Sequence, residues 1–197
     1  VGDLTVNLPS QSGTSRNMNI NASISYTGGT NRTLTLNCAN EMVFANATGI
    51  TSSTASLNVV LRTALGLPDN GYIQMNGVTI QTNGGHFWAG GGPTTATWNG
   101  LTVGNSLART WADDIPGLSV IGSAITTNGG NLYFAGLSHN TGDDDGINWG
   151  VGIERSTISS AAGSIEIIGE VKGRFTHGYG TYLNGNTGAV SIGTTLG

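Results

Sequence analysis

Two tryptophans and two aspartates stand close together in the longest stretch that departs from the regular pattern of the chain. Trp98 precedes Trp111 in this stretch, and Asp113 and Asp114 follow almost at once. An aromatic ring that stacks on a sugar, with carboxylates that orient its hydroxyls, suits saccharide binding. We therefore predict carbohydrate contacts at Trp98, Trp111, Asp113 and Asp114. The competing interpretation is that both rings anchor the insertion to a scaffold, because aromatic side chains contribute large packing areas.

A second group of carboxylates occupies the run Asp143-Asp144-Asp145-Gly146. Calcium is a hard cation that takes several oxygen ligands, so Asp143 and Asp145 are candidate calcium ligands. The run lacks the later bidentate glutamate and the spacing of a known calcium loop. A solvated loop is the simpler interpretation, and we expect no bound metal and no cofactor.

The run from His139 to Gly146, followed by Thr176-His177-Gly178, resembles the order of motifs in polygalacturonase-type glycosidases. Glycoside hydrolysis needs carboxylates that converge on one groove. Here Gly142 stands where the first motif would end in aspartate, and the remaining aspartates are bunched in one short run. We therefore predict that the chain is not an enzyme. Carbohydrate binding or cleavage remains the alternative function.

Three asparagines, Asn21, Asn31 and Asn46, fit the Asn-X-Ser/Thr acceptor pattern for glycosylation. Such matches also arise by chance in a chain this rich in asparagine, serine and threonine. Asn21, Asn31 and Asn46 are therefore candidate glycosylation sites, with an unmodified surface as the alternative.

The composition favours short strands joined by tight corners. Only 9% of the residues are charged, one of them a lysine, whereas 33 are glycine. Helical faces need more Glu and Lys than this, while hydroxyl and β-branched residues suit pleated surfaces. A net charge of -4 with scattered arginines argues against a nucleic-acid partner. The single cysteine, Cys38, excludes an internal disulfide, and we expect it to be a small buried residue.

An internal repeat organises most of the chain. Each copy begins with an isoleucine that leads into Thr or Ser, continues through a corner of small residues, and ends in alternating apolar positions. This alternation points successive side chains inward and outward. The leading residues are Ile24, Ile50, Ile80, Ile125 and Ile158, and the predicted apolar pairs are Leu57/Val59, Phe87/Ala89, Leu132/Phe134 and Ile165/Ile167.

Stacked copies of such a unit predict an all-β chain folded as a parallel β-helix, because one coil cannot bury its apolar row alone. Coils of about 20 to 25 residues would give about eight coils and a rod about 40 Å long. We expect residues 1–197 to form a single segment of a longer chain. Corner insertions are predicted near 90–117, 137–146 and 172–186, where charged and aromatic residues gather.

Several phrases of the repeat resemble filamentous-haemagglutinin-like, two-partner-secreted exoproteins, including the high-molecular-weight adhesins. They are Asn17-Met18-Asn19-Ile20-Asn21-Ala22-Ser23-Ile24, Arg32-Thr33-Leu34-Thr35-Leu36-Asn37, Thr54-Ala55-Ser56-Leu57-Asn58-Val59-Val60-Leu61, Thr127-Asn128-Gly129-Gly130-Asn131-Leu132 and Gly163-Ser164-Ile165-Glu166-Ile167. The resemblance covers about residues 4 to 192, interrupted by the insertions. The Asn-Pro-containing motifs of the family's secretion domain do not occur in this sequence, so the chain is similar to the stalk region.

The resemblance implies a right-handed β-helix that is exported through an outer-membrane secretion pore and stays secreted or on the bacterial cell surface. It implies an extracellular structural and adhesive stalk for attachment, aggregation or biofilm formation, with host or matrix glycans or proteins as partners. Residues 1–8 and 189–196 also read as strands, and exposed strand edges pair readily. We therefore expect either continuation into a longer rod or end-to-end self-association.

Overall fold

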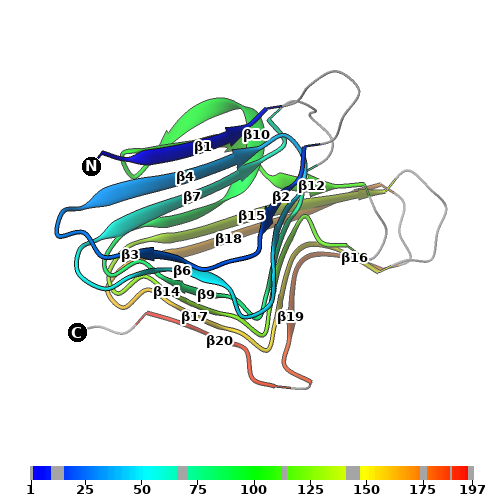
Figure 1. Cartoon of the computed structure of the whole chain (residues 1–197). Coiled ribbons are helices and arrows are strands. Elements are labelled where there is room, and N and C mark those ends of the chain that lie inside the picture. The colour runs from blue at the N-terminus through cyan, green and yellow to red at the C-terminus, as the bar shows by residue number, and fades with distance from the viewer. Residues whose placement is uncertain are drawn as a thin grey trace.

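The computed structural model describes residues 2–9, 16–65, 71–111, 115–140, 147–173, 177–186 and 188–194. These residues form an all-β parallel β-solenoid, and the described strands are accompanied by no helix (Figure 1). The predicted fold class is confirmed, while the right-handed sense of the coil remains a prediction. Within the described ranges, no helix exists that could cross a bilayer.

Three parallel sheets, which we call walls 1, 2 and 3, line the solenoid. Wall 1 contains β1 (Leu4–Leu8), β4 (Arg32–Cys38), β7 (Leu57–Thr63), β10 (Phe87–Trp98), β15 (Leu132–Asn140) and β18 (Ile165–Gly173), with β11 (Leu101–Ser106) and β12 (Ala108–Thr110) beside them. Wall 2 contains β2 (Met18–Ile20), β5 (Met42–Phe44), β8 (Ile73–Asn76), β13 (Leu118–Ile121), β16 (Ile147–Glu154) and β19 (His177–Asn184). Wall 3 contains β3 (Ile24–Tyr26), β6 (Gly49–Ser52), β9 (Thr79–Gln81), β14 (Ala124–Thr126), β17 (Thr157–Ser159) and β20 (Ser191–Gly193).

The strands of wall 3 carry the repeated isoleucine in register. Each leading isoleucine pairs with the next along the stack, and Ile192 extends the column by one strand that the repeat did not reveal. Their side chains turn inward and join one continuous apolar core with the inward residues of walls 1 and 2. The predicted stacking of the repeat is confirmed at these positions.

The predicted alignment of Leu57 with Phe87 is wrong by two residues. Phe87 pairs with Val59 on one side and with Leu132 on the other. The corner that precedes Val59 is longer than the corner that precedes Phe87, because Ile50 lies nine positions before Val59 and Ile80 only seven before Phe87. The column in wall 1 therefore runs through Leu34, Val59, Phe87, Leu132 and Ile165.

The prediction of about eight coils is also wrong, because walls 2 and 3 each contain six strands within the described residues. The paired isoleucines are 26 to 45 positions apart, so corners and insertions consume more chain than a 20 to 25-residue coil allows. Six levels at about 4.8 Å span about 24 Å from first to last.

The corner between walls 3 and 1 is built from a buried hydroxyl and a close backbone contact. In four levels the hydroxyl donates to the carbonyl three residues later, from Ser52, Thr82, Thr127 and Ser160. The corner carbonyl belongs to Gly85, Gly130 or Gly163 in the last three of these levels. A Cβ at Gly130 would lie 1.9 Å from the Gly85 carbonyl oxygen, so this position requires glycine.

Side chains also link one level to the next where wall 1 begins. The Ser56 amide donates to Asn31 Oδ1 (3.1 Å) and the His86 amide to Asn58 Oδ1 (2.9 Å). The Asn131 amide then donates to His86 Nδ1 (2.9 Å), and the Ser164 amide to Asn131 Oδ1 (3.0 Å). The imidazole of His86 thus accepts a backbone amide of the next level, as the asparagine side chains do in the other levels.

The three predicted insertions differ in kind. Residues 90–117 contain the hairpin β10–β11, which turns at Asn99 and Gly100 with φ of 45° and 77°, and then β12, which pairs beside β15. Positive φ at both positions is the geometry that favours an Asn-Gly hairpin turn. Of residues 137–146, the first four belong to β15, and 141–146 lie outside the described residues. Residues 172–186 include β19, a regular strand of wall 2.

Cys38 is fully buried at the end of β4, as expected. Its thiol lies 3.4 Å from the carbonyl oxygens of Asn40 and Glu41. Burial raises the pKa of this thiol from 9.0 to about 12, so Cys38 stays protonated and inert at neutral pH.

Candidate functional site

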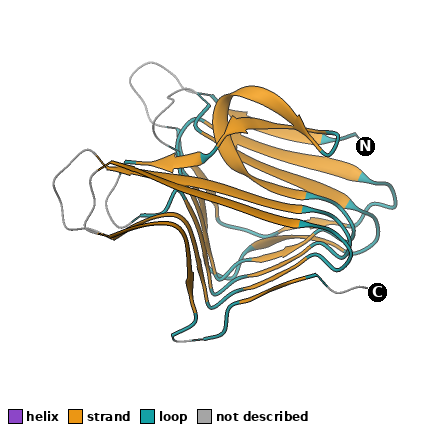
Figure 2. Cartoon of the chain, turned by 180° about the vertical axis from the view of Figure 1, so that it is seen from behind, coloured by secondary structure: helices purple, strands orange, loops and turns teal. Residues whose placement is uncertain are grey.

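The β10–β11 hairpin folds back over the outer face of wall 1, where it is visible as the curled ribbon in Figure 2. Four buried side chains hold it there, two from the wall (Val60 and Trp88) and two from β11 (Leu101 and Val103). Trp98 and Tyr133 pack against the edge of this small second core. The hairpin is therefore a fixed overhang on the scaffold.

Arg62 ties the base of the hairpin to β7. Its side chain is buried, and its guanidinium donates to the Gly92 carbonyl (2.7 and 2.9 Å) and to the Thr94 carbonyl (2.9 Å). Burial lowers the pKa of this guanidinium from its ordinary value. The forked donor group matches two carbonyls at once, which a lysine ammonium does with less geometric precision.

A groove of about 430 Å³ separates the overhang from the outer face of the last strands of wall 1. The hairpin forms one side of the groove, through Trp98 and through residues 103–107, which run from β11 to just beyond it. The floor carries outward positions of β15 and β18, which alternate with the inward core residues. Its main side chains are Trp88, Trp98, Tyr133, Glu166, Ile168 and Glu170.

The aromatic rings of the groove support one another. Trp88 and Tyr133 are stacked with ring centroids 5.7 Å apart and planes 3° apart. The Trp98 ring is tilted by 52° over Tyr133 at 5.7 Å, and its other neighbour is His86, edge-on at 5.8 Å. Burial lowers the pKa of His86 from 6.5, so a neutral imidazole supports Trp98 at neutral pH. These contacts pack the Trp98 ring against the scaffold and leave it half-buried at the groove.

The polar groups of the groove are acidic on one side and phenolic in the middle. Glu166 pairs with Tyr133 across β18 and β15. Burial, and secondarily the Glu166 charge, raise the pKa of Tyr133, so its hydroxyl remains a donor. Glu170 lies two outward positions further along β18, and its carboxylate is 3.2 Å from the Lys172 ammonium. The groove therefore offers a hydroxyl donor and carboxylate acceptors beside apolar rings.

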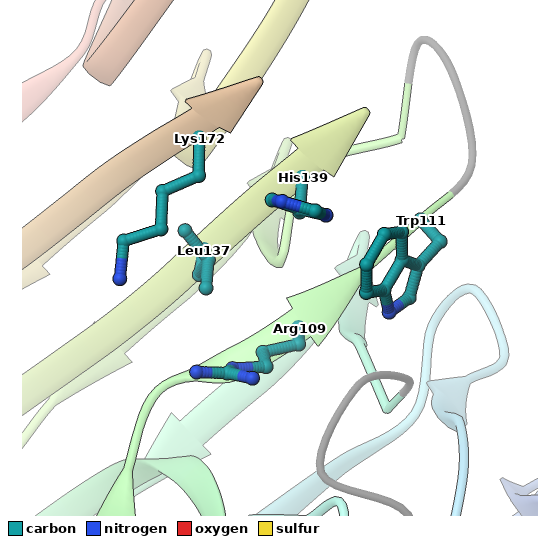
Figure 3. Close-up of a pocket in the computed structure, with 5 residues that line it drawn as sticks. All are labelled: Arg109, Trp111, Leu137, His139 and Lys172. Atoms are coloured by element: carbon teal, nitrogen blue, oxygen red, sulfur yellow. The ribbon is translucent and has the colours of Figure 1, made fainter. Parts of the chain in front are cut away.

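A second, smaller pocket of about 110 Å³ lies further along the same face (Figure 3). Arg109, Trp111, Leu137, His139 and Lys172 line it. The Trp111 and His139 rings meet edge to face with centroids 4.0 Å apart. This basic cup differs from the groove in charge and in size.

Of the four predicted carbohydrate contacts, the structure describes only the two tryptophans. Trp98 lines the groove and Trp111 lines the basic cup, so the two rings serve different pockets. Asp113, Asp114, Asp143 and Asp145 lie outside the described residues. Across the part of the chain that is described, no group of three or more His, Cys, Asp or Glu side chains could hold a metal ion.

The three candidate glycosylation sites all lie on the surface. Asn21 follows β2, and Asn46 stands in the turn between β5 and β6. Asn31 is also exposed, although its Oδ1 accepts the Ser56 amide. An attached glycan would use the nitrogen of each side chain, so the hydrogen bond of Asn31 is compatible with modification.

Tyr133, Glu166 and Glu170 were not among the site residues predicted from the sequence. Each lies at an outward position of an alternating strand, beside inward residues that the repeat did identify. That alternation was the available signal, but it does not show that the hairpin reaches over these positions. The Asn99-Gly100 turn was a second signal, because Asn-Gly between two strand-like runs indicates a hairpin.

A scan of protein-family models finds no match to the chain, and searches of curated proteins and of solved structures find no similar protein. The resemblance to filamentous-haemagglutinin-like exoproteins therefore remains a prediction from the sequence phrases. The solenoid itself stands on the strand pairing described above.

Proposed function

We propose that this chain is an extracellular structural and adhesive stalk of a large bacterial surface exoprotein. The observation that carries the proposal is the unbroken stack of apolar columns through all three walls, with a hairpin fixed on the outside. A solenoid of this kind gives length and stiffness, because each level contacts only its neighbours. The overhanging hairpin and the corners then present specific side chains to the surroundings.

Export and partners follow from the same proposal. The stalk passes through an outer-membrane secretion pore and acts on the cell surface, where host or matrix glycans or proteins are its partners. The low share of charged residues and the buried, unreactive thiol are compatible with this setting. The non-enzymatic character of the chain is part of the proposal as well.

We also propose that the open ends of the solenoid stack on further levels, including those of a second copy. Leu4 and Val6 in the first level are 57% and 38% exposed, and Leu183 in the last is 53% exposed. Leu4 begins the column that ends at Ile165, so apolar residues stand at matching positions of both ends. Sedimentation should show concentration-dependent association that Val6→Glu and Leu183→Glu each abolish; association unchanged in both variants would contradict end-to-end stacking.

Carbohydrate binding is the second candidate function, and the groove beside Trp98 favours it. The same groove favours cleavage of a carbohydrate less than binding. Glu166 and Glu170 are four residues apart on one strand, which separates their Cα atoms by about 13 Å. Glycoside hydrolysis needs two carboxyl groups that act together, whereas the Glu170 carboxylate is paired with the Lys172 ammonium (3.2 Å), so this arrangement suits binding better than hydrolysis.

Surface display tests the adhesive proposal. The chain would be anchored on a non-adherent bacterium, and attachment to matrix-coated and glycan-coated plates would be counted after washing. A flexible Gly/Ser linker of equal residue number serves as the control. We expect more attachment with the solenoid than with the linker; equal attachment on every surface would refute the adhesive role.

A further inference from the structure

We propose that the groove between the β10–β11 hairpin and the outer face of β15 and β18 binds an uncharged saccharide. The proposal rests on the adhesive function above and names the part of the surface that performs it. The site differs from the one predicted from the sequence, because it combines Trp98 with Tyr133 and Glu166 and does not use Trp111.

The volume and lining of the groove fit a sugar. At about 430 Å³ it falls within the range of small-ligand sites, and it combines apolar walls with a few polar groups. Trp98 is half-buried, and the Tyr133 ring that it contacts also stacks on Trp88. A pyranose presents apolar C–H faces and a rim of hydroxyls. The rings can stack on such a face while the rim meets the polar groups.

The polar groups also determine which saccharide is accepted. The raised pKa of Tyr133 keeps its hydroxyl protonated, and the carboxylate of Glu166 accepts hydrogen bonds from sugar hydroxyls. Both named carboxylates of the groove would repel a uronate, sialate or sulfate group, and like charges at close range suppress a wrong partner. Lys172 lies beside Glu170, so Glu166 is the carboxylate on which this selection mainly depends.

The groove is organised before any ligand arrives. Arg62 fixes the base of the hairpin, and Trp88, Leu101 and Val103 fix its underside. The backbone of the floor is held in register with the solenoid. Little ordering is then needed on binding, which favours affinity.

The basic cup around Trp111 provides a matched control. It holds an aromatic ring on the same face, but its volume is about 110 Å³ and its polar side chains are Arg109, His139 and Lys172. An acidic ligand would suit that pocket better than a neutral one. Trp111→Ala therefore removes an exposed tryptophan without touching the groove.

Affinity electrophoresis is the experiment. The chain would run in native gels that contain mannan, galactomannan, xyloglucan or mixed-linkage β-glucan, and in gels that contain polygalacturonate or heparin. We expect retardation by at least one neutral polysaccharide and none by the acidic ones. Trp98→Ala should weaken the retarding interaction about tenfold, the effect of losing one stacked ring. Trp111→Ala should leave it unchanged.

Glu166→Gln supplies a readout that a purely structural role would not change, and because the Glu166 side chain is exposed, we expect this variant to fold. This variant should keep neutral binding within about threefold and gain retardation by polygalacturonate, since the repelling charge is gone. Melting curves of each variant exclude unfolding as the cause. If Trp98→Ala fails to fold, Glu166→Gln decides.

Three results would overturn the proposal: no retardation by any neutral polysaccharide, preference of the wild type for acidic ones, or loss of binding in Trp111→Ala but not in Trp98→Ala. The adhesive function fails separately. Displayed wild type that attaches to a protein matrix, with no neutral-saccharide binding in gels, would refute the groove and keep the adhesive stalk. Retardation in gels without attachment of displaying cells would support the groove and refute the stalk's adhesive role.

Discussion

Gly130→Ala should destabilise the solenoid at the corner where successive levels come closest. The added Cβ would stand 1.9 Å from the Gly85 carbonyl oxygen and 2.4 Å from its carbonyl carbon. Ordinary contacts of this kind begin near 3.4 Å, so one corner would have to move by more than 1 Å. Two hydrogen bonds oppose that movement. The Phe87 amide donates to the Asn131 backbone carbonyl (2.9 Å), and the Thr127 hydroxyl donates to the Gly130 carbonyl.

The expected cost combines two effects. Overpacking a closely packed site costs about 1 to 3 kcal/mol. Weakening one of the neighbouring hydrogen bonds adds about 1 kcal/mol. A total of about 2 to 4 kcal/mol lowers the melting temperature of a chain of this size by roughly 5 to 15 °C.

Circular dichroism at the β-sheet minimum, followed during heating and in urea, measures the effect. Gly29→Ala is the matched control, because nothing lies within 4 Å of a Cβ at that position. We expect the control to stay within about 0.5 kcal/mol of the wild type. If Gly130→Ala melts with the control, the close stacking of the corners is wrong.

Three further predictions concern buried and partly buried groups. Burial lowers the pKa of His86 below 6.5, so the stability that neutral His86 contributes is complete above about pH 6.5 and is lost as the pH falls through the folded-state pKa. His86→Asn keeps an acceptor for the Asn131 amide but does not titrate, so the urea midpoint of this variant should depend less on pH between 7 and 5 than that of the wild type. Arg62→Met leaves the carbonyls of Gly92 and Thr94 without these donors and should cost about 2 to 4 kcal/mol, with faster hydrogen exchange confined to the hairpin; exchange that is faster everywhere would argue against a local anchor. Cys38 should resist a maleimide in the native protein and react fully in guanidinium, as mass spectrometry would show; labelling of the native protein would contradict its burial.

The sequence predicted the stacking of the solenoid well wherever a level is marked by a corner of fixed chemistry. In four of the five copies the isoleucine is followed two positions later by a Ser or Thr whose hydroxyl closes the corner, and this local signal marks the register of wall 3. Leu57 was predicted to align with Phe87, but Val59 does so. The alternation of apolar residues does not reveal how many residues a corner contains, and this number differs between levels. Wall 2 was not predicted because its strands, such as Met42–Phe44, lie in the variable stretches between the repeated units, where no recurring residue pattern marks them.

The groove depends on information that a repeat does not contain. The inward positions next to Tyr133 and Glu166 belong to the repeated pattern, but the ring that covers this part of the wall comes from Trp98, in an insertion. Bringing these residues together requires the hairpin to fold backward over the wall, which Arg62 and Trp88 impose through long-range contacts. Sequence spacing instead grouped Trp98 with Trp111, which lines another pocket.

We propose that this stiff solenoid adheres through the groove on its outer face. Single-molecule force spectroscopy tests it most directly, with the chain tethered to a probe and drawn from a surface coated with the neutral polysaccharide that retards it in gels. We expect frequent rupture events with no prior unfolding extension, and we expect them to become rare when Trp98 is replaced by alanine or when free polysaccharide is added. Rupture events that are equally frequent in Trp98→Ala, or a chain that unravels before the contact breaks, would contradict it.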